Sequence, residues 1–89
     1  MVLSITVSQK ELDTLNLFFV KSFGFTLNIL IGKFRTGEIL MPQIGALTFD
    51  KGIKTIRFGA SAENAAFIDS LKIGSKSYTI RTLIASLQA

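Results

Sequence analysis

Basic residues stand beside aromatic rings at three places in this sequence, a combination that can bind nucleic acid. Proteins that bind single strands pair a basic groove with rings on which bases stack. If residues 33 to 35 form a strand, the central ring points away from both flanking charges, which weakens this interpretation. Core packing is the alternative role for each phenylalanine. The candidate nucleic-acid-binding residues are Lys33, Phe34, Arg35, Lys54, Arg57, Lys76 and Tyr78.

The chain contains neither histidine nor cysteine, and this removes most catalytic chemistry. Histidine-dependent triads, thiol nucleophiles and iron–sulfur clusters are excluded. Structural zinc sites are disfavoured, because they are built mainly from cysteine and histidine. We therefore expect no catalytic residue, no metal and no cofactor, and we expect that the protein is not an enzyme.

Two further motifs do not support a chemical site. Glu11 and Asp13 are the closest acidic pair, but they fall on the surface near a predicted helix start, whereas acid–base catalysis needs an enclosed site. The segment from Gly74 to Ser77 lacks the glycine that directly precedes the lysine of a phosphate-binding loop. We interpret both motifs as solvated polar segments.

The composition indicates one small, unusually apolar domain spanning residues 1–89. A chain this short has a thin stability margin, and it has no disulfide to reinforce it. Hydrophobic residues make up 48% of the chain, charged residues make up 18%, and the mean hydropathy is +0.47. Such a sequence carries more apolar surface than one small core can hide, so we expect a partner surface. The net charge is +4, and a charge of this size is typical of a small soluble domain. The basic residues form no continuous run.

The sequence does not indicate membrane insertion or secretion. The first residues lack the basic and long apolar regions of a signal peptide. Residues 15–31 are the best candidate span, but they are short and contain Asn16, Lys21 and Asn28. A membrane partner is therefore not expected, and a cytoplasmic or virion-associated location is the interpretation we favour.

Several elements can be predicted from local patterns. Residues 2–7 are rich in β-branched side chains and indicate a strand, and residues 53–58 alternate as a strand does. Ser8 opens a capping box with Glu11, which predicts a short helix over residues 9–15. Ser61 opens a second helix that ends near Leu71. Seven glycines recur at short intervals as turn signals, without an accompanying sequence repeat.

The segment from Leu15 to Ile31 is the most informative part of the sequence. Its apolar residues alternate with period two, which predicts a hairpin that turns near residues 21–24. The alternative is that the preceding helix continues through Leu12, Leu15, Phe19 and Ser22. Residues 71–73 and 78–84 are predicted to form the two strands of a last hairpin. Together these patterns predict a mainly β fold: a small antiparallel sheet, sandwich or barrel of about five to seven strands with one or two short helices.

The alternation also predicts the core and an interface. The second face of the 15–31 hairpin carries Phe18, Val20 and Leu30, and we expect a partner to cover it. The predicted core comprises the apolar residues of the remaining alternating faces and of the inner side of the short helix. These are Leu17, Phe19, Phe25, Leu27, Ile29, Ile56, Phe58, Phe67, Ile80 and Ile84.

These features favour a non-enzymatic, β-rich assembly module. Apolar surplus and open strand edges are typical of domains that pair with copies of themselves or with a host assembly. A self-associating structural component of a virus or tail is the class that such a domain resembles. The alternative is a small β-barrel that binds single-stranded nucleic acid. The mass in solution, measured with and without an oligonucleotide, distinguishes the two hypotheses.

Overall fold

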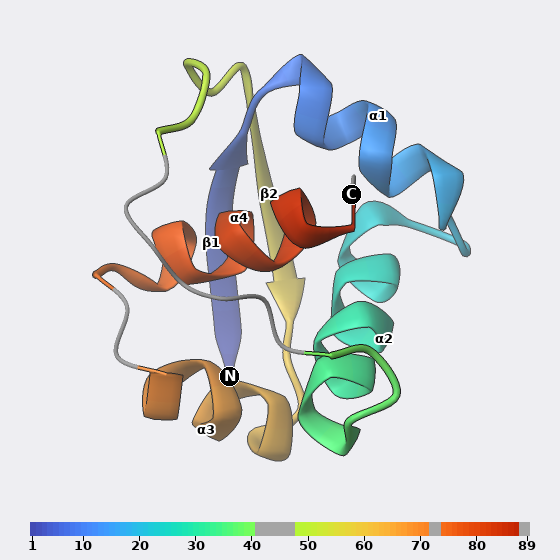
Figure 1. Cartoon of the computed structure of the whole chain (residues 1–89), viewed down its shortest axis with the longest axis vertical. Coiled ribbons are helices and arrows are strands. Elements are labelled where there is room, and N and C mark those ends of the chain that lie inside the picture. The colour runs from blue at the N-terminus through green and yellow to red at the C-terminus, as the bar shows by residue number, and fades with distance from the viewer. Residues whose placement is uncertain (41–47, 72–73, 88–89) are drawn as a thin grey trace.

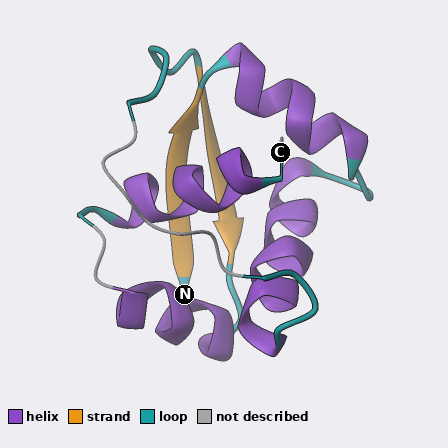
Figure 2. Ribbon diagram, in the orientation of Figure 1, coloured by secondary structure: helices purple, strands orange, loops and turns teal. Residues whose placement is uncertain are grey.

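The computed structural model describes residues 1–40, 48–71 and 74–87, and it shows four helices around a two-stranded sheet within them (Figures 1 and 2). The predicted strand at residues 2–7 and the predicted second helix are confirmed. In chain order the elements are β1 (Val2–Val7), α1 (Gln9–Leu17), α2 (Phe23–Thr36), β2 (Lys54–Gly59), α3 (Ala62–Leu71) and α4 (Lys76–Ser86).

The predicted mainly β fold is wrong. Helix accounts for 56% of the described residues, and the sheet there has two strands in place of a sandwich or barrel of five to seven. The description of the chain as β-rich is corrected with it. The main source of the error is that most of residues 15–31 and all of residues 78–84 are helical in place of the predicted strands.

The two strands form an antiparallel ribbon with one covered face. Leu3, Ile5 and Val7 of β1 point inward, as do Ile56 and Phe58 of β2, and all are buried. Helix α4 packs against β1 and crosses one face of the ribbon, while α2 packs against β2 (Figure 1). The alternate residues of both strands are exposed. A two-stranded ribbon is marginal alone, so this helical layer stabilises it.

Capping serines explain why residues 15–31 are helical. The Ser8 capping box is present and starts α1, which ends at Leu17. A new helix then starts at Ser22, whose Oγ accepts a hydrogen bond from the Phe25 amide at 3.1 Å. It ends at Gly37, which has a left-handed φ of 85°. Its buried apolar residues fall at helical spacing, namely Leu27, Leu30, Ile31 and Phe34.

The predicted core is therefore half right. Leu17, Phe19 and Phe25 were placed inside by the alternation, but they are 80%, 46% and 43% exposed. Ile29 and Phe67 are intermediate. The predicted core residues that are buried are Leu27, Ile56, Phe58, Ile80 and Ile84.

Helix α4 replaces the predicted last hairpin. Ser75 is its N-cap, and the Ser75 Oγ accepts a hydrogen bond from the Tyr78 amide at 3.0 Å. Apolar residues at 80, 83, 84 and 87 then face the core or its edge. Residues 72–73 of the predicted hairpin lie outside the described residues.

The order strand–helix–helix occurs twice, although the sequence shows no obvious repeat. The caps Ser8 and Ser61 are 53 positions apart, and the caps Ser22 and Ser75 are separated by the same 53 positions. In both units a buried threonine donates its hydroxyl to the carbonyl of the second cap: Thr26 to Ser22 at 2.7 Å and Thr79 to Ser75 at 3.0 Å. The chain is thus built from two equivalent units. The first consists of β1, α1 and α2, and the second consists of β2, α3 and α4.

The strand register indicates that the two units are related by an approximate two-fold axis. Ser4 and Arg57 are equivalent residues of the two units, and they also face each other at the centre of the ribbon. Antiparallel pairing about an equivalent central pair is what a two-fold axis produces. The seam between α2 and α4 agrees, because four equivalent pairs line it: Leu27 and Ile80, Leu30 and Leu83, Ile31 and Ile84, Phe34 and Leu87.

Two glycines of α2 test the packing of this helix on the ribbon. A Cβ added at Gly24 would lie 2.6 Å from the Phe58 Cβ, so Gly24→Ala should lower the free energy of unfolding by about 1–3 kcal/mol. A Cβ at Gly32 would have its nearest contact at 3.7 Å, at the Asn64 side chain. Gly32→Ala should therefore raise the free energy of unfolding by about 0.5–1 kcal/mol. Urea unfolding of both variants checks this, and equal effects would contradict the close approach of α2 to β2.

Candidate nucleic-acid interface

The outer face of the ribbon is a short, largely polar surface that none of the described helices covers. Arg57 lies at its centre opposite Ser4, and Thr6 lies opposite Thr55 at one end. The two threonine hydroxyl oxygens are 3.1 Å apart and hydrogen-bonded to each other. Val2 faces Gly59 at the other end, and Val2 is 63% exposed. Neither strand contains an acidic residue.

A hollow of about 330 Å³ lies beside this face, where α2 begins. The Asn28 side-chain amide donates to the Gly59 carbonyl at 3.3 Å and so ties α2 to the end of β2. The hollow therefore lies between the first turn of α2 and β2, the strand that carries Arg57. Its lining comprises Ser22, Gly24, Phe25, Asn28, Arg57, Phe58 and Gly59.

Two polar contacts lie at equivalent positions between the two units, but they are made by different kinds of residue. Asn64 of α3 donates its side-chain amide to the Asn28 side-chain oxygen at 2.7 Å and to the Asn28 carbonyl at 2.9 Å. The residues equivalent to Asn64 and Asn28 in the other unit are Glu11 and Arg81. The Arg81 Nη2 lies 2.6 Å from a Glu11 carboxylate oxygen, and Nε donates to both oxygens. Each contact joins the first helix of one unit to the second helix of the other.

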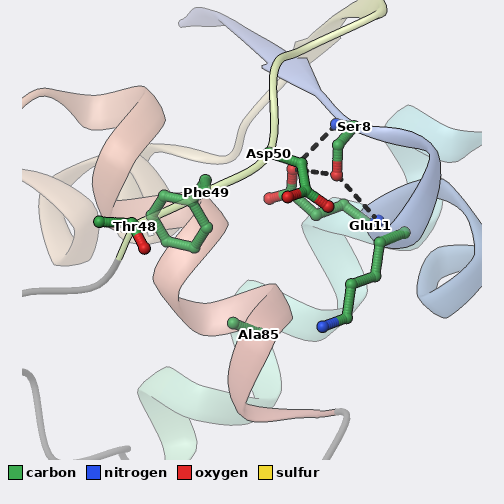
Figure 3. Close-up of a pocket in the computed structure, with 7 residues that line it drawn as sticks. Ser8, Glu11, Thr48, Phe49, Asp50 and Ala85 are labelled. Atoms are coloured by element: carbon green, nitrogen blue, oxygen red, sulfur yellow. Dashed lines mark hydrogen bonds between the residues drawn. The ribbon is translucent and has the colours of Figure 1, made fainter.

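The Glu11 carboxylate borders a separate pocket of about 210 Å³ (Figure 3). Its oxygen Oε1 also accepts hydrogen bonds from the Ser8 amide and hydroxyl. Arg81 donates to the Asp50 carbonyl at 2.7 Å and stacks over the Phe49 ring at 4.7 Å. The interpretation of Glu11 as a solvated charge is therefore wrong: its side chain is only 4% exposed and its oxygens are occupied by these donors, so the carboxylate is a structural anchor and not a free general base.

The first predicted basic–aromatic cluster does not form a stacking surface. Phe34 is 3% exposed and belongs to the core, as the core-packing alternative predicts. Lys33 is exposed, and Arg35 donates Nε to the Asn64 side-chain oxygen at 3.0 Å. All three lie in the C-terminal half of α2.

The remaining predicted residues lie on two elements. Arg57 and Lys54 are exposed on β2, and the Lys54 ammonium lies 5.6 Å from the centre of the Phe23 ring. Lys76 and Tyr78 are in the first turn of α4. Lys76 forms an ion pair with Asp69 at 3.5 Å, and Tyr78 packs edge-to-face on Phe49 at 5.3 Å. Of the seven candidates, only Arg57 belongs to the outer ribbon face.

The predicted interface residues are divided between surface and core. Phe18 and Val20 lie between α1 and α2 and are 41% and 44% exposed. Leu30 is 5% exposed and packs in the core, because α2 turns it inward. The exposed apolar residues that cluster in sequence here are Leu17, Phe18, Phe19, Val20 and Phe25.

Sequence reasoning missed three residues of the ribbon face, namely Ser4, Thr6 and Thr55. The alternation of residues 2–7 does indicate that 4 and 6 share one face. Their significance depends on the pairing of β1 with β2, and local patterns do not reveal that pairing.

Metal and membrane sites find no support in the part of the chain that is described. No group of three or more acidic side chains gathers there as a metal site would require. None of the helices described is both long and apolar enough to cross a bilayer.

Removing Arg81 should cost far more stability than removing Lys76. Arg81→Met leaves the buried Glu11 carboxylate without its cation, so the free energy of unfolding should fall by about 3–5 kcal/mol. Lys76→Met breaks an ion pair whose side chains are half exposed, and should cost about 1 kcal/mol or less. Denaturant unfolding measures both, and a loss below about 1 kcal/mol for Arg81→Met would contradict the anchoring role.

The chain was also compared with known proteins. No protein-family model, no curated protein and no solved structure matches it.

Proposed function

We propose that this protein binds double-stranded DNA by placing the outer face of the β1–β2 ribbon in the major groove. The observation that carries the proposal is an antiparallel ribbon of two six-residue strands with helices packed on its other face. The major groove is about 12 Å wide and admits a two-stranded ribbon. A class of DNA-binding proteins reads base edges with such ribbons.

The side chains on this face have the chemistry that base reading requires. An arginine can donate two hydrogen bonds to the O6 and N7 atoms of guanine, and Arg57 has the central position. The hydroxyls of Ser4, Thr6 and Thr55 can donate to or accept from base edges. The absence of carboxylates from both strands avoids repulsion by the phosphates.

The surroundings of the ribbon favour contact with the DNA backbone. The first turn of α2 lies beside Arg57 at the hollow described above. Backbone amides at a helix N-terminus are common phosphate contacts. Lys54 adds a positive charge on β2, and the whole chain carries +4. Phosphate contacts position a protein on the duplex, while base contacts provide the specificity.

On the ribbon face, duplex DNA is favoured over a single strand. Binding to single strands relies on accessible rings. Phe34 and Phe58, which lie next to basic residues in the sequence, are 3% and 6% exposed. Tyr78 is engaged with Phe49. The ribbon face offers hydrogen-bonding groups in place of stacking platforms.

Arg57→Ala should weaken binding to a duplex by roughly 5- to 150-fold, because a bidentate guanine contact contributes about 1–3 kcal/mol. Lys33→Ala is the matched control: it removes one exposed positive charge from the C-terminal half of α2, whereas Arg57 lies on β2. It should change the Kd only a few-fold. Fluorescence anisotropy with labelled duplexes at fixed salt measures both. Equal losses for the two variants, or tighter binding to single strands than to duplex, would show that the ribbon is not the reading surface.

Self-association is the second candidate function, and the exposed apolar residues between α1 and α2 favour it. Five large apolar side chains there are each at least 41% exposed. An apolar patch formed by such side chains would be typical of a protein interface. An assembling structural protein remains the function proposed by this surface, and it is compatible with DNA binding at the ribbon.

A double substitution at Phe18 and Val20 tests this second candidate. If the surface forms an oligomer, Phe18→Lys with Val20→Lys should yield a monomer, since two charges cannot be buried there without cost. The control is Leu40→Lys with Ile53→Lys, which changes two residues exposed elsewhere. Light scattering after size exclusion gives the masses. A wild-type protein that is monomeric at high micromolar concentration would refute the candidate.

A further inference from the structure

The outer face of the ribbon departs from the two-fold symmetry of the units. The two-fold relation pairs Val2 with Thr55, Ser4 with Arg57, and Thr6 with Gly59 as equivalent positions. No equivalent pair holds the same residue. The inward positions differ much less, because they are apolar in both units: Leu3 and Ile56, Ile5 and Phe58, Val7 and Ala60.

The differences give the face a direction. One end presents the hydrogen-bonded hydroxyls of Thr6 and Thr55. The centre presents a single guanidinium, and the other end presents Val2 beside Gly59, without a polar side chain. Hydroxyls contact several base edges, a guanidinium selects guanine, and apolar groups contact the methyl group of thymine. Rotating the ribbon by 180° about the two-fold axis would therefore present a different kind of side chain to each position of a bound DNA site.

We propose that this chain recognises a non-palindromic DNA sequence and binds it in one orientation, with Arg57 on a guanine near the centre of the site. The inference rests on the proposed function. A ribbon built from two identical chains presents the same side chains to both half-sites, so its site mirrors its two-fold symmetry. Covalent linkage of two unlike units removes that constraint. It also ensures that each molecule contains one copy of each unit.

Selection from a pool of duplexes with a randomised centre of about 12 base pairs tests the proposal, since one helical turn is 10–10.5 base pairs. The wild-type protein should yield a consensus without internal two-fold symmetry. The selected duplex should bind at least about ten-fold tighter than either palindrome made by duplicating one of its halves, because each mismatched base pair costs roughly ten-fold. A palindromic consensus, or equal affinity for the selected duplex and one palindrome, would overturn the inference.

A symmetrised variant provides the matched comparison. Val2→Thr, Ser4→Arg and Thr6→Gly together give β1 the outer side chains of β2. This variant should select a palindromic site. Ser4→Arg with Thr55→Val and Gly59→Thr serves if the first variant fails to fold, because it also makes the outer side chains of the two strands alike, keeps Arg57, and places a Cβ at Gly59 that meets nothing within 4 Å. A consensus that stays asymmetric in a folded symmetrised variant would overturn the inference.

The outcomes separate this inference from the proposed function. If duplex DNA binds and Arg57→Ala weakens it, but the selected site is palindromic or absent, the ribbon binds DNA and the directional reading is wrong. If the wild-type protein does not bind the duplex pool at any salt concentration, both are wrong.

Discussion

The antiparallel pairing of β1 with β2 joins residues that are far apart in the chain: Thr6 and Thr55, for example, are separated by 49 positions. This pairing brings the two strand–helix–helix units together. It places five apolar side chains on one face, where α2 and α4 cover them, and leaves the other face to solvent. Two strands have no further sheet partner, so the helices must supply the stability that a larger sheet would have. The free face is a consequence of the same arrangement.

The polar contacts between units explain why unlike units pair. Glu11 meets Arg81 on one side of the two-fold axis, and Asn64 meets Asn28 on the other. A first unit paired with its own copy would place Glu11 opposite Asn28, and a buried carboxylate without a cation is strongly unfavourable. A second unit paired with its copy would leave Arg81 opposite Asn64. The charge pair therefore favours the pairing of a first unit with a second unit over the pairing of like units.

Local signals in the sequence predict the element starts better than the fold. Ser8 with Glu11 and Ser61 correctly mark two helices, and residues 2–7 a strand. The alternation at 15–31 misleads because apolar residues surround α2: Leu27 and Leu30 pack inward, while Phe25 stays exposed. Cap serines at 22 and 75 were the missed signal. Arg57 was identified from its charge, but Ser4, Thr6 and Thr55 became a site only through long-range pairing, which short patterns do not encode.

The most direct measurement of the central claim is an NMR titration of the isotope-labelled protein with duplex DNA. If the ribbon enters the major groove, the backbone amide signals of Ser4, Thr6, Thr55 and Arg57 should shift on binding. Signals of Phe18 and Val20, between α1 and α2, should stay in place. Shifts confined to residues 17–25, with the ribbon signals unchanged, would contradict the account and would identify the apolar surface as the binding site.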